Sequence, residues 1–313
     1  MWLVGVQGGG FGLGLALAAL RLGHRVVLRT RQERLRTEEP HPSLKLVKEA
    51  EPLGECEIIF LAVPSAHIET VVDELGGVLD GRHLVVHVSR GLVGDALIPI
   101  SRLIRERTVV RRVACLAGPV SAECLTRGLP GGGIVGTEFP EVAEAVRQVI
   151  GGPSLRLYET RDVVGCEVAS ALVGLLVVAL GYAKGHGYGP SSLATLLTRG
   201  LAEAVRIGTA LGAQERTFFG MAGVGDLIAA VGGDERPEFR LGQALARGLP
   251  LEAAGKEAGA HIEGISIARR VHHFAERKGI EAPISQAIAD IVEGKKGPQE
   301  VVDGLMRRRT RFE

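Results

Sequence analysis

The first half of the chain alternates short apolar runs with segments of helical periodicity. The apolar runs have the length of buried strands, and they lie at Trp2–Val6, Arg25–Arg29, Ile58–Val63, Leu84–Val88, Val113–Ala117, Ile134–Gly136 and Ser154–Tyr158. The segments of helical spacing predict helices at Leu13–Leu22, Ile68–Leu75, Ile98–Arg105 and Pro140–Ile150. This alternation predicts an α/β fold with a mostly parallel, doubly wound sheet, whose ligand lies at the carboxyl ends of the strands.

After about Thr160 the strand-like runs stop and long helical patterns follow. These patterns cover Val163–Gly181, Leu193–Leu211, Phe239–Arg247, Ile262–Lys278 and Pro283–Glu293. The change predicts a sheet domain over residues 1–160 and an all-helical domain over residues 161–313. Three loops are expected at the ligand-binding edge of the sheet, and they contain Pro64-Ser65, Ser89-Arg90-Gly91 and Gly118-Pro119.

A glycine-rich turn joins the first predicted strand to the first predicted helix. It reads Gln7-Gly8-Gly9-Gly10-Phe11-Gly12, so two of the three glycine positions of the G-x-G-x-x-G motif are kept and Gln7 stands at the first. Small residues let the backbone approach a pyrophosphate, and the N–H groups at the helix start attract the anion. The pattern predicts that residues 1–160 form a dinucleotide-binding Rossmann domain. The alternative is a glycine-rich turn that binds no ligand.

Basic residues follow the second predicted strand, where dinucleotide-binding domains commonly carry an acidic residue for the ribose 2′-hydroxyl. This chain has Arg29-Thr30-Arg31 at that point. Because arginine suits a 2′-phosphate, the sequence favours NADP over NAD, although NAD stays possible. The alternative is that these arginines form a solvated basic face.

The composition indicates a protein with large cores and little net charge. Of the 313 residues, 46% are hydrophobic, which suits two domains. The 37 basic residues nearly balance the 36 acidic ones, so we expect neither nucleic acid nor a membrane surface as a partner. The four cysteines are scattered without metal-ligand spacing, which indicates reduced thiols of a cytoplasmic protein and no metal site. Glycines interrupt the apolar start, so no signal peptide is expected.

The longest apolar run, Val168–Leu180, has hardly a polar residue on any helix face. It is shorter than the ~20 residues that span a bilayer, so we expect a buried helix and no membrane span. Either the domain core or a subunit interface must cover this helix. We expect a homodimer.

Short motifs along the whole chain carry a family resemblance. Besides the glycine turn, the first half contains Leu61-Ala62-Val63-Pro64-Ser65, Ser89-Arg90-Gly91-Leu92, Gly118-Pro119, Ala122-Glu123 and Gly128-Leu129-Pro130. The second half contains Asp162-Val163-Val164-Gly165, Glu167, Ala171-Leu172, Leu197-Thr198-Arg199-Gly200-Leu201-Ala202-Glu203, Ala222-Gly223-Val224-Gly225-Asp226-Leu227 and Ile262-Glu263-Gly264. With these motifs in this order, the chain resembles bacterial NAD(P)-dependent sn-glycerol-3-phosphate dehydrogenases.

The resemblance implies hydride transfer between a nicotinamide and C2 of glycerol 3-phosphate or dihydroxyacetone phosphate. It implies a small anionic substrate and a helical domain that serves substrate binding and dimerisation. The residues expected to bind the cofactor are Gly8, Gly9, Gly10, Phe11, Gly12, Arg31, Pro64, Arg90, Ala122 and Glu263. The residues expected to bind the substrate are Arg90, Gly118, Arg199, Asp226 and Arg236.

The chain departs from the family where the chemistry is expected. Val173 and Gly174 stand where the family has its proton-accepting lysine and the asparagine after it, and Arg90 replaces a second lysine. The family's Ser-Arg-Asn loop for the substrate phosphate corresponds to Arg236, Pro237 and Glu238. Valine cannot move a proton, arginine stays protonated, and a glutamate repels a phosphate.

The catalytic residue therefore stays unknown, with His87 and Lys184 as the weak candidates. His87 lies two residues before Ser89 on a predicted strand, so the two side chains share a face. Lys184 follows Val173 by eleven residues, nearly on the same helix face but about 16 Å farther along. Arg199 and Asp226 have an alternative interpretation as a structural ion pair.

Two classes of function fit these observations. The first is an oxidoreductase of the resembled family, with rebuilt catalytic groups or with a different hydroxy or keto substrate. The second is a non-catalytic relative that keeps the dinucleotide-binding scaffold and has lost the chemistry. The first is favoured because the cofactor half keeps its motifs better than the substrate half.

Overall fold

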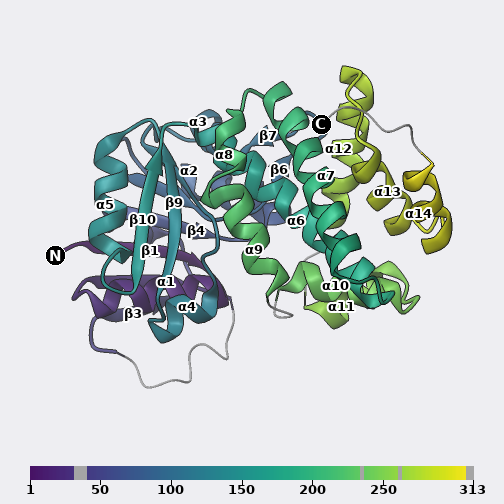
Figure 1. Ribbon diagram of the computed structural model, residues 1–313. Coiled ribbons are helices and arrows are strands. Elements are labelled where there is room, and N and C mark those ends of the chain that lie inside the picture. Colours follow the sequence, from purple (N-terminus) through teal and green to yellow (C-terminus); the bar gives the residue numbers. More distant parts are fainter. Residues whose placement is uncertain (32–40, 233–235, 260–262, 308–313) are drawn as a thin grey trace.

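A twisted sheet flanked by helices forms the N-terminal half of the computed structural model, which describes residues 1–31, 41–232, 236–259 and 263–307 (Figure 1). Its eight described strands lie in the order β10-β9-β8-β5-β4-β1-β2-β3. Their bounds are β1 Leu3–Gly8, β2 Arg25–Arg29, β3 Leu44–Val47, β4 Ile58–Ala62, β5 Leu84–His87, β8 Val113–Ala117, β9 Gly131–Thr137 and β10 Leu155–Thr160. All neighbours pair in parallel except β8 and β9. The predicted parallel, doubly wound α/β sheet is confirmed.

Helices cover both faces of this sheet. They are α1 Gly10–Arg21, α2 Ile68–Gly76, α3 Ile100–Arg107, α4 Ala122–Arg127 and α5 Pro140–Ile150. Successive side chains of a strand point to opposite faces, so Phe60 of β4 packs into the core beneath α1 and α5, whereas Ile59 packs into the core beneath α2 and α3. Burial on both faces explains the near-continuous apolar runs in the sequence.

The sequence missed three features of the sheet domain. The edge strand β3 pairs only with β2 and is only partly buried, so its apolar pattern is weak. The helix expected from Ile98 begins at Ile100, because Ile98–Pro99 forms β7, which pairs with β6, Leu92–Val93. The short helix α4 was not predicted.

The C-terminal half is helical and lies beside the sheet domain (Figure 1). Its described helices are α6 Val163–Gly185, α7 Pro190–Ala210, α8 Glu215–Phe218, α9 Asp226–Val231, α10 Pro237–Ala246, α11 Leu251–Ala258, α12 Glu263–Lys278, α13 Pro283–Val292 and α14 Pro298–Met306. The predicted all-helical second half is thereby confirmed as a fold class. β10 ends at Thr160 and α6 begins three residues later.

Helix α6 is the centre of the helical half. Its 23 residues are long and apolar enough to cross a bilayer, yet 94% of its most apolar window is buried inside the protein, as in the core helix of a globular fold. The core of the helical half therefore covers the run Val168–Leu180, and no subunit interface is needed to bury it. Our inference of a homodimer from this run loses its basis.

Helices α6 and α10 pack backbone to backbone. A Cβ on Gly242 of α10 would overlap the carbonyl oxygen of Val178, and a Cβ on Gly181 of α6 would overlap that of Phe239. Only glycine permits such an approach. The contact fixes α10, from Phe239 in its first turn to Gly242, against the C-terminal half of α6, which matters for the site described next.

Candidate active site

The turn between β1 and α1 leaves the helix start open. An ideal Cβ on Gly8 would lie 2.5 Å from the carbonyl oxygen of Ala62, so this position tolerates only glycine. Gly9 is the N-cap of α1 and Gly10 has no neighbouring atom within 4 Å of its ideal Cβ position. Among the described residues no side chain caps α1, and its first turn holds no acidic residue. Free N–H groups and open space at a helix start fit a pyrophosphate.

The Gln7 side chain points to the end of β2. It is 7% exposed, and its Oε1 accepts a hydrogen bond from Arg29 Nη1 at 3.2 Å. Arg29 also contacts Glu74 of α2, with Nη1 2.8 Å from Oε2, and donates from Nε to the Lys48 carbonyl oxygen at 2.9 Å. The side chain of Arg29 is only 11% exposed, and the Glu74 carboxylate beside it balances its charge.

Arg31 differs from Arg29 in exposure. Its side chain is 83% exposed, and its Nη2 lies 3.7 Å from Glu74 Oε1. Of the two arginines expected to meet a 2′-phosphate, Arg31 is therefore the one whose guanidinium is open to a ligand. Glu74 lies 45 residues from Arg29 along the chain, and no local sequence signal could have revealed the pair.

Four charged side chains meet between the two halves of the protein. Arg90 follows β5, and its guanidinium contacts Asp226 at the start of α9 through Nη1 to Oδ2 and through Nη2 to Oδ1 at 3.3 Å. Arg236, the N-cap of α10, donates from Nη1 to Asp226 Oδ1 at 3.2 Å. Glu238 Oε2 lies 3.7 Å from Arg236 Nε. We call Arg90, Asp226, Arg236 and Glu238 the seam cluster.

Burial and neighbouring charges shift the pKa values of the two guanidinium groups. Burial alone would lower the pKa of Arg90, but the Asp226 and Glu238 carboxylates raise it above its ordinary value. Burial, together with the positive charge of Arg90, lowers the pKa of Arg236. Both groups remain cations at neutral pH because free arginine titrates far above it. Neither can take up the proton of an alcohol.

Gly118 and the loop after β8 complete this region. The Gly118 carbonyl oxygen accepts from Arg90 Nη2 at 3.4 Å. An ideal Cβ on Gly118 would lie 3.1 Å from the carbonyl oxygen of Met221, so the sheet half touches the helical half here. Arg90 and Gly118 therefore sit together at the carboxyl ends of β5 and β8.

Val173 and Gly174 lie in the middle of α6. Val173 is 1% exposed and belongs to the core of the helical half. An ideal Cβ on Gly174 would lie 3.9 Å from Glu238 Oε1. The Glu238 carboxylate therefore lies close to the backbone of Gly174, at a distance where a Cβ atom would just make van der Waals contact with it.

The remaining expected site residues are spread over several elements. Pro64 precedes the short turn Ser65–His67 after β4, and Ala122 opens α4, which packs against α1. Arg199 is exposed on α7, and the Asp226 carboxylate pairs with Arg90 and Arg236. The side chain of Glu263 lies outside the described part of the chain.

The two candidate catalytic residues, His87 and Lys184, each lie against another side chain of the helical half. His87 is 0% exposed, and its Nε2 is 3.0 Å from Glu167 Oε1 of α6 without hydrogen-bond alignment. Glu167 also accepts from Ser101 N at 2.7 Å and from Ser101 Oγ at 2.6 Å. Lys184, in the last turn of α6, lies over the Phe239 ring, 5.2 Å from its centroid. His87 thus joins the two halves from within the core.

Comparison with known proteins identifies the family of the chain. The model of the NAD-dependent glycerol-3-phosphate dehydrogenase N-terminus matches residues 4–143, and that of the C-terminus matches residues 162–303. The chain belongs to this family. The resemblance expected from the sequence motifs is confirmed.

Relatives and solved structures agree with this assignment. The chain is 30% identical to a glycerol-3-phosphate dehydrogenase [NAD(P)+] of Desulfitobacterium hafniense, covering 97% of this chain and 91% of the relative. It is 31% identical to one of Thermoanaerobacter sp., covering 97% and 96%. The crystal structure of glycerol-3-phosphate dehydrogenase from Coxiella burnetii superposes with a TM-score of 0.91 at 24% identity, covering 98% of this chain and 99% of that one.

Replacing Asp226 by asparagine removes the carboxylate that both arginines share. We expect Asp226→Asn to lower the free energy of unfolding by about 3 kcal/mol, because it removes the carboxylate that Arg90 contacts and leaves Arg236 only Glu238, at 3.7 Å. Urea denaturation measures the change. Asp73→Asn is the matched control, since the exposed Asp73 carboxylate also accepts two contacts from one arginine, at 3.1 and 2.9 Å. An Asp226→Asn variant as stable as the control would contradict a structural role for the seam cluster.

Proposed function

We propose that this chain is an NAD(P)-dependent dehydrogenase that interconverts a CH–OH group and a carbonyl group of a small substrate. The observation that carries the proposal is the common edge of the sheet, along which the glycine turn after β1, Arg90 after β5 and Gly118 after β8 all lie. Ligands of doubly wound sheets bind at this edge. The relatives bear the name of an active dehydrogenase, which favours catalysis over a role in binding alone.

The cofactor that fits this edge is a nicotinamide dinucleotide, with NADP favoured. The N–H groups at the start of α1 would hold the pyrophosphate, and the exposed Arg31 guanidinium would hold a 2′-phosphate. Pro64, Ala122 and Glu263 stay predictions as further cofactor contacts. When bound, the reduced nicotinamide supplies the hydride that the carbonyl carbon receives.

The side chains of the seam cluster would act on the substrate. The Arg90 guanidinium can donate to the carbonyl oxygen and stabilise the negative charge that develops there. Arg90 cannot transfer a proton to the carbonyl oxygen, and Val173 has no titratable group that could do so. Dihydroxyacetone phosphate, the ketone that the family resemblance implies, would therefore react without the proton donor that the family uses.

Cofactor preference tests the dinucleotide assignment. We expect NADPH to bind more tightly than NADH, and Arg31→Ala to weaken NADPH binding about tenfold by removing the charge opposite the 2′-phosphate. Isothermal calorimetry gives both affinities. Arg25→Ala is the matched control, because Arg25 is exposed at the opposite end of β2. Equal affinities for NADPH and NADH in the wild type would refute the preference.

Turnover tests the chemistry. We expect very slow or no oxidation of NADPH with dihydroxyacetone phosphate, since general acid–base help is worth ~10²- to 10⁴-fold in rate. Val173→Lys with Gly174→Asn should raise this rate, and adding Pro237→Arg with Glu238→Asn should raise it further. Urea denaturation checks that each variant folds, because Val173 is buried.

Robust wild-type turnover of dihydroxyacetone phosphate would mean that another group moves the proton. His87 and Lys184 would then be the first residues to replace. Cofactor binding without turnover of any carbonyl substrate would favour the non-catalytic alternative.

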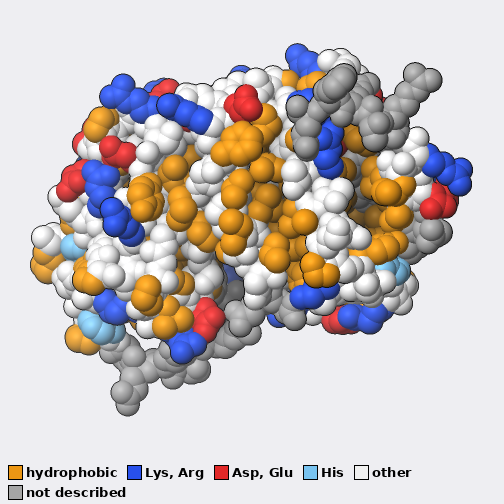
Figure 2. All heavy atoms as spheres, viewed as in Figure 1, with side chains coloured by type: hydrophobic (Ala, Val, Ile, Leu, Met, Phe, Trp, Pro, Cys, Tyr) orange, Lys and Arg blue, Asp and Glu red, His pale blue; other side chains and the backbone are white. Residues whose placement is uncertain are grey.

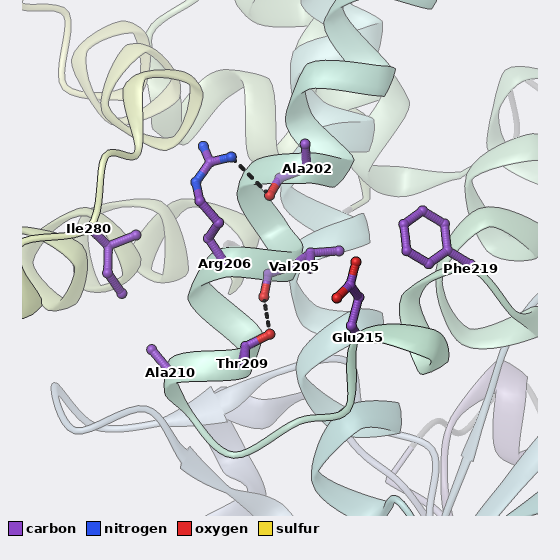
Figure 3. Close-up of a pocket in the computed structure, with 8 residues that line it drawn as sticks. All are labelled: Ala202, Val205, Arg206, Thr209, Ala210, Glu215, Phe219 and Ile280. Carbon is purple, nitrogen blue, oxygen red and sulfur yellow. Dashed lines mark hydrogen bonds between the residues drawn. The ribbon is translucent and has the colours of Figure 1, made fainter. Parts of the chain in front are cut away.

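We also propose that two copies associate, now on the basis of exposed apolar side chains. Phe219, Ile228 and Val231 are 58%, 66% and 48% exposed near α8 and α9. Figure 2, viewed as in Figure 1, shows hydrophobic side chains gathered over the middle of the face on which α8 and α9 lie. A hollow of about 650 Å³ opens nearby (Figure 3), lined by Ala202, Val205, Arg206, Thr209, Ala210, Glu215, Phe219 and Ile280. Large exposed apolar patches commonly mark interfaces.

Light scattering tests the homodimer. We expect a mass of twice 33.0 kDa at micromolar concentration, and Phe219→Asp should shift it toward the monomer by burying a charge. Val109→Asp is the matched control, since Val109 is 57% exposed on the sheet half. A wild-type monomer would contradict the proposal.

We place the protein in the cytoplasm, on the state of its cysteines. All four are free thiols, and Cys56, Cys115 and Cys166 are buried. Burial raises the pKa of Cys56 and of Cys166 to about 12, so both stay protonated and unreactive. Free thiols are typical of a reducing compartment.

A further inference from the structure

The seam cluster is electrically balanced within the chain. It contains two guanidinium groups and two carboxylates, and Asp226 contacts both arginines. Glu238 supplies the second carboxylate, 3.7 Å from Arg236 Nε. Among the described residues of the cluster, each positive charge thus has a carboxylate of the chain beside it. These four described side chains therefore carry no excess positive charge that would attract an anionic substrate.

Glu238 lies on a helix whose position is fixed. It follows Pro237 in the first turn of α10, where helix N–H groups favour an anion. α10 cannot slide away, because its glycine contact with α6 has no free space. The first turn of α10 thus brings a carboxylate of the protein itself to the seam cluster.

The two carboxylates of the cluster differ in how far their side chains are exposed to solvent. The Asp226 side chain is 2% exposed and saturated by the arginines, whereas Glu238 is 23% exposed and its Oε1 faces the bare backbone of Gly174. The Arg90 side chain is 26% exposed. A substrate at this place would therefore meet the Arg90 guanidinium as the more exposed donor, beside Arg236 at 17% exposure, and the Glu238 carboxylate as the acceptor.

We propose that Glu238 is a specificity-determining residue that excludes substrates with a phosphate and selects an uncharged hydroxy-ketone or hydroxy-aldehyde. A carbonyl oxygen accepts from Arg90, and a neighbouring hydroxyl donates to Glu238. A phosphate dianion would instead meet a like charge with no surplus cation to offset it.

The chemistry rests on the dehydrogenase function proposed above. The carbonyl carbon gains a hydride from NAD(P)H, and the carbonyl oxygen gains a proton from solvent. The products are the alcohol and NAD(P)+.

Steady-state kinetics with matched substrates test the selection. Dihydroxyacetone and dihydroxyacetone phosphate differ only in the phosphate, so the ratio of their kcat/KM values reports its effect. We expect the wild type to favour dihydroxyacetone, and Glu238→Gln to shift the ratio toward the phosphate ester at least about tenfold. Glu252→Gln should leave the ratio unchanged, because Glu252 also lies in the first turn of a helix, α11, but is exposed. Wild-type preference for the ester, unchanged in Glu238→Gln, would overturn the proposal.

Calorimetry separates this proposal from the dehydrogenase function. Glycerol 3-phosphate is titrated into the wild type and Glu238→Gln, each with and without saturating NADPH, and glycerol serves as the uncharged probe. We expect glycerol 3-phosphate to bind Glu238→Gln at least about tenfold more tightly than the wild type. Such a gain without turnover of any substrate would support the selection while refuting the dehydrogenase function. Equal affinity of both proteins for glycerol 3-phosphate would refute the selection whether or not turnover occurs.

Discussion

The carboxylate of Asp226 is the point on which the arrangement of the site depends. It is 2% exposed and contacts an arginine that follows a strand of the sheet and another that begins a helix of the second half. A buried carboxylate is costly unless cations and hydrogen bonds surround it, so Arg90 and Arg236 have little freedom to leave. Their positions in turn fix the carboxyl edge of β5 and the first turn of α10. Glu167 provides a second tie between the halves through Ser101 and His87.

The changes from the family pattern fit one another in space. Position 174 of α6 is a glycine, without a side chain, and the Glu238 carboxylate of α10 lies next to it. Val173 continues the apolar core of α6, and Glu238 balances the second arginine of the cluster. Random loss of a site would leave cavities or unmatched charges, whereas these substitutions form a packed network with one buried guanidinium atom, Arg236 Nη2, lacking a partner among the described atoms. This packing supports our proposal that the site is rebuilt.

The sequence predicted the architecture well because the physics that shapes it is local. Strands that are buried on both faces appear in the sequence as apolar runs, and the helices of the second half appear as long periodic patterns. The order of these patterns was sufficient to predict the fold class. The partly exposed edge strand β3 lacks this signal. The course of α6 was predicted, but its composition does not say whether the core or a partner covers it.

The chemistry of the site was predicted less completely because it depends on pairs distant in sequence. Arg29 reads as a cation open to a phosphate, but Glu74 and Gln7 bind it from other elements. His87 shares a strand face with Ser89, but its side chain is fully buried against Glu167 of α6 and is not open to a substrate. Asp226 and Arg236 were singled out by motif and register. Their common contact with Arg90 could be found only in three dimensions.

A crystal structure of the NADPH complex tests most directly whether the seam cluster is the active site. We expect the nicotinamide ring to lie against the loops after β5 and β8, beside an intact Arg90–Asp226 pair and with the Glu238 carboxylate at Gly174. A nicotinamide bound away from Arg90 and Gly118, or a Glu238 side chain turned out to solvent with its place filled by another group, would contradict it.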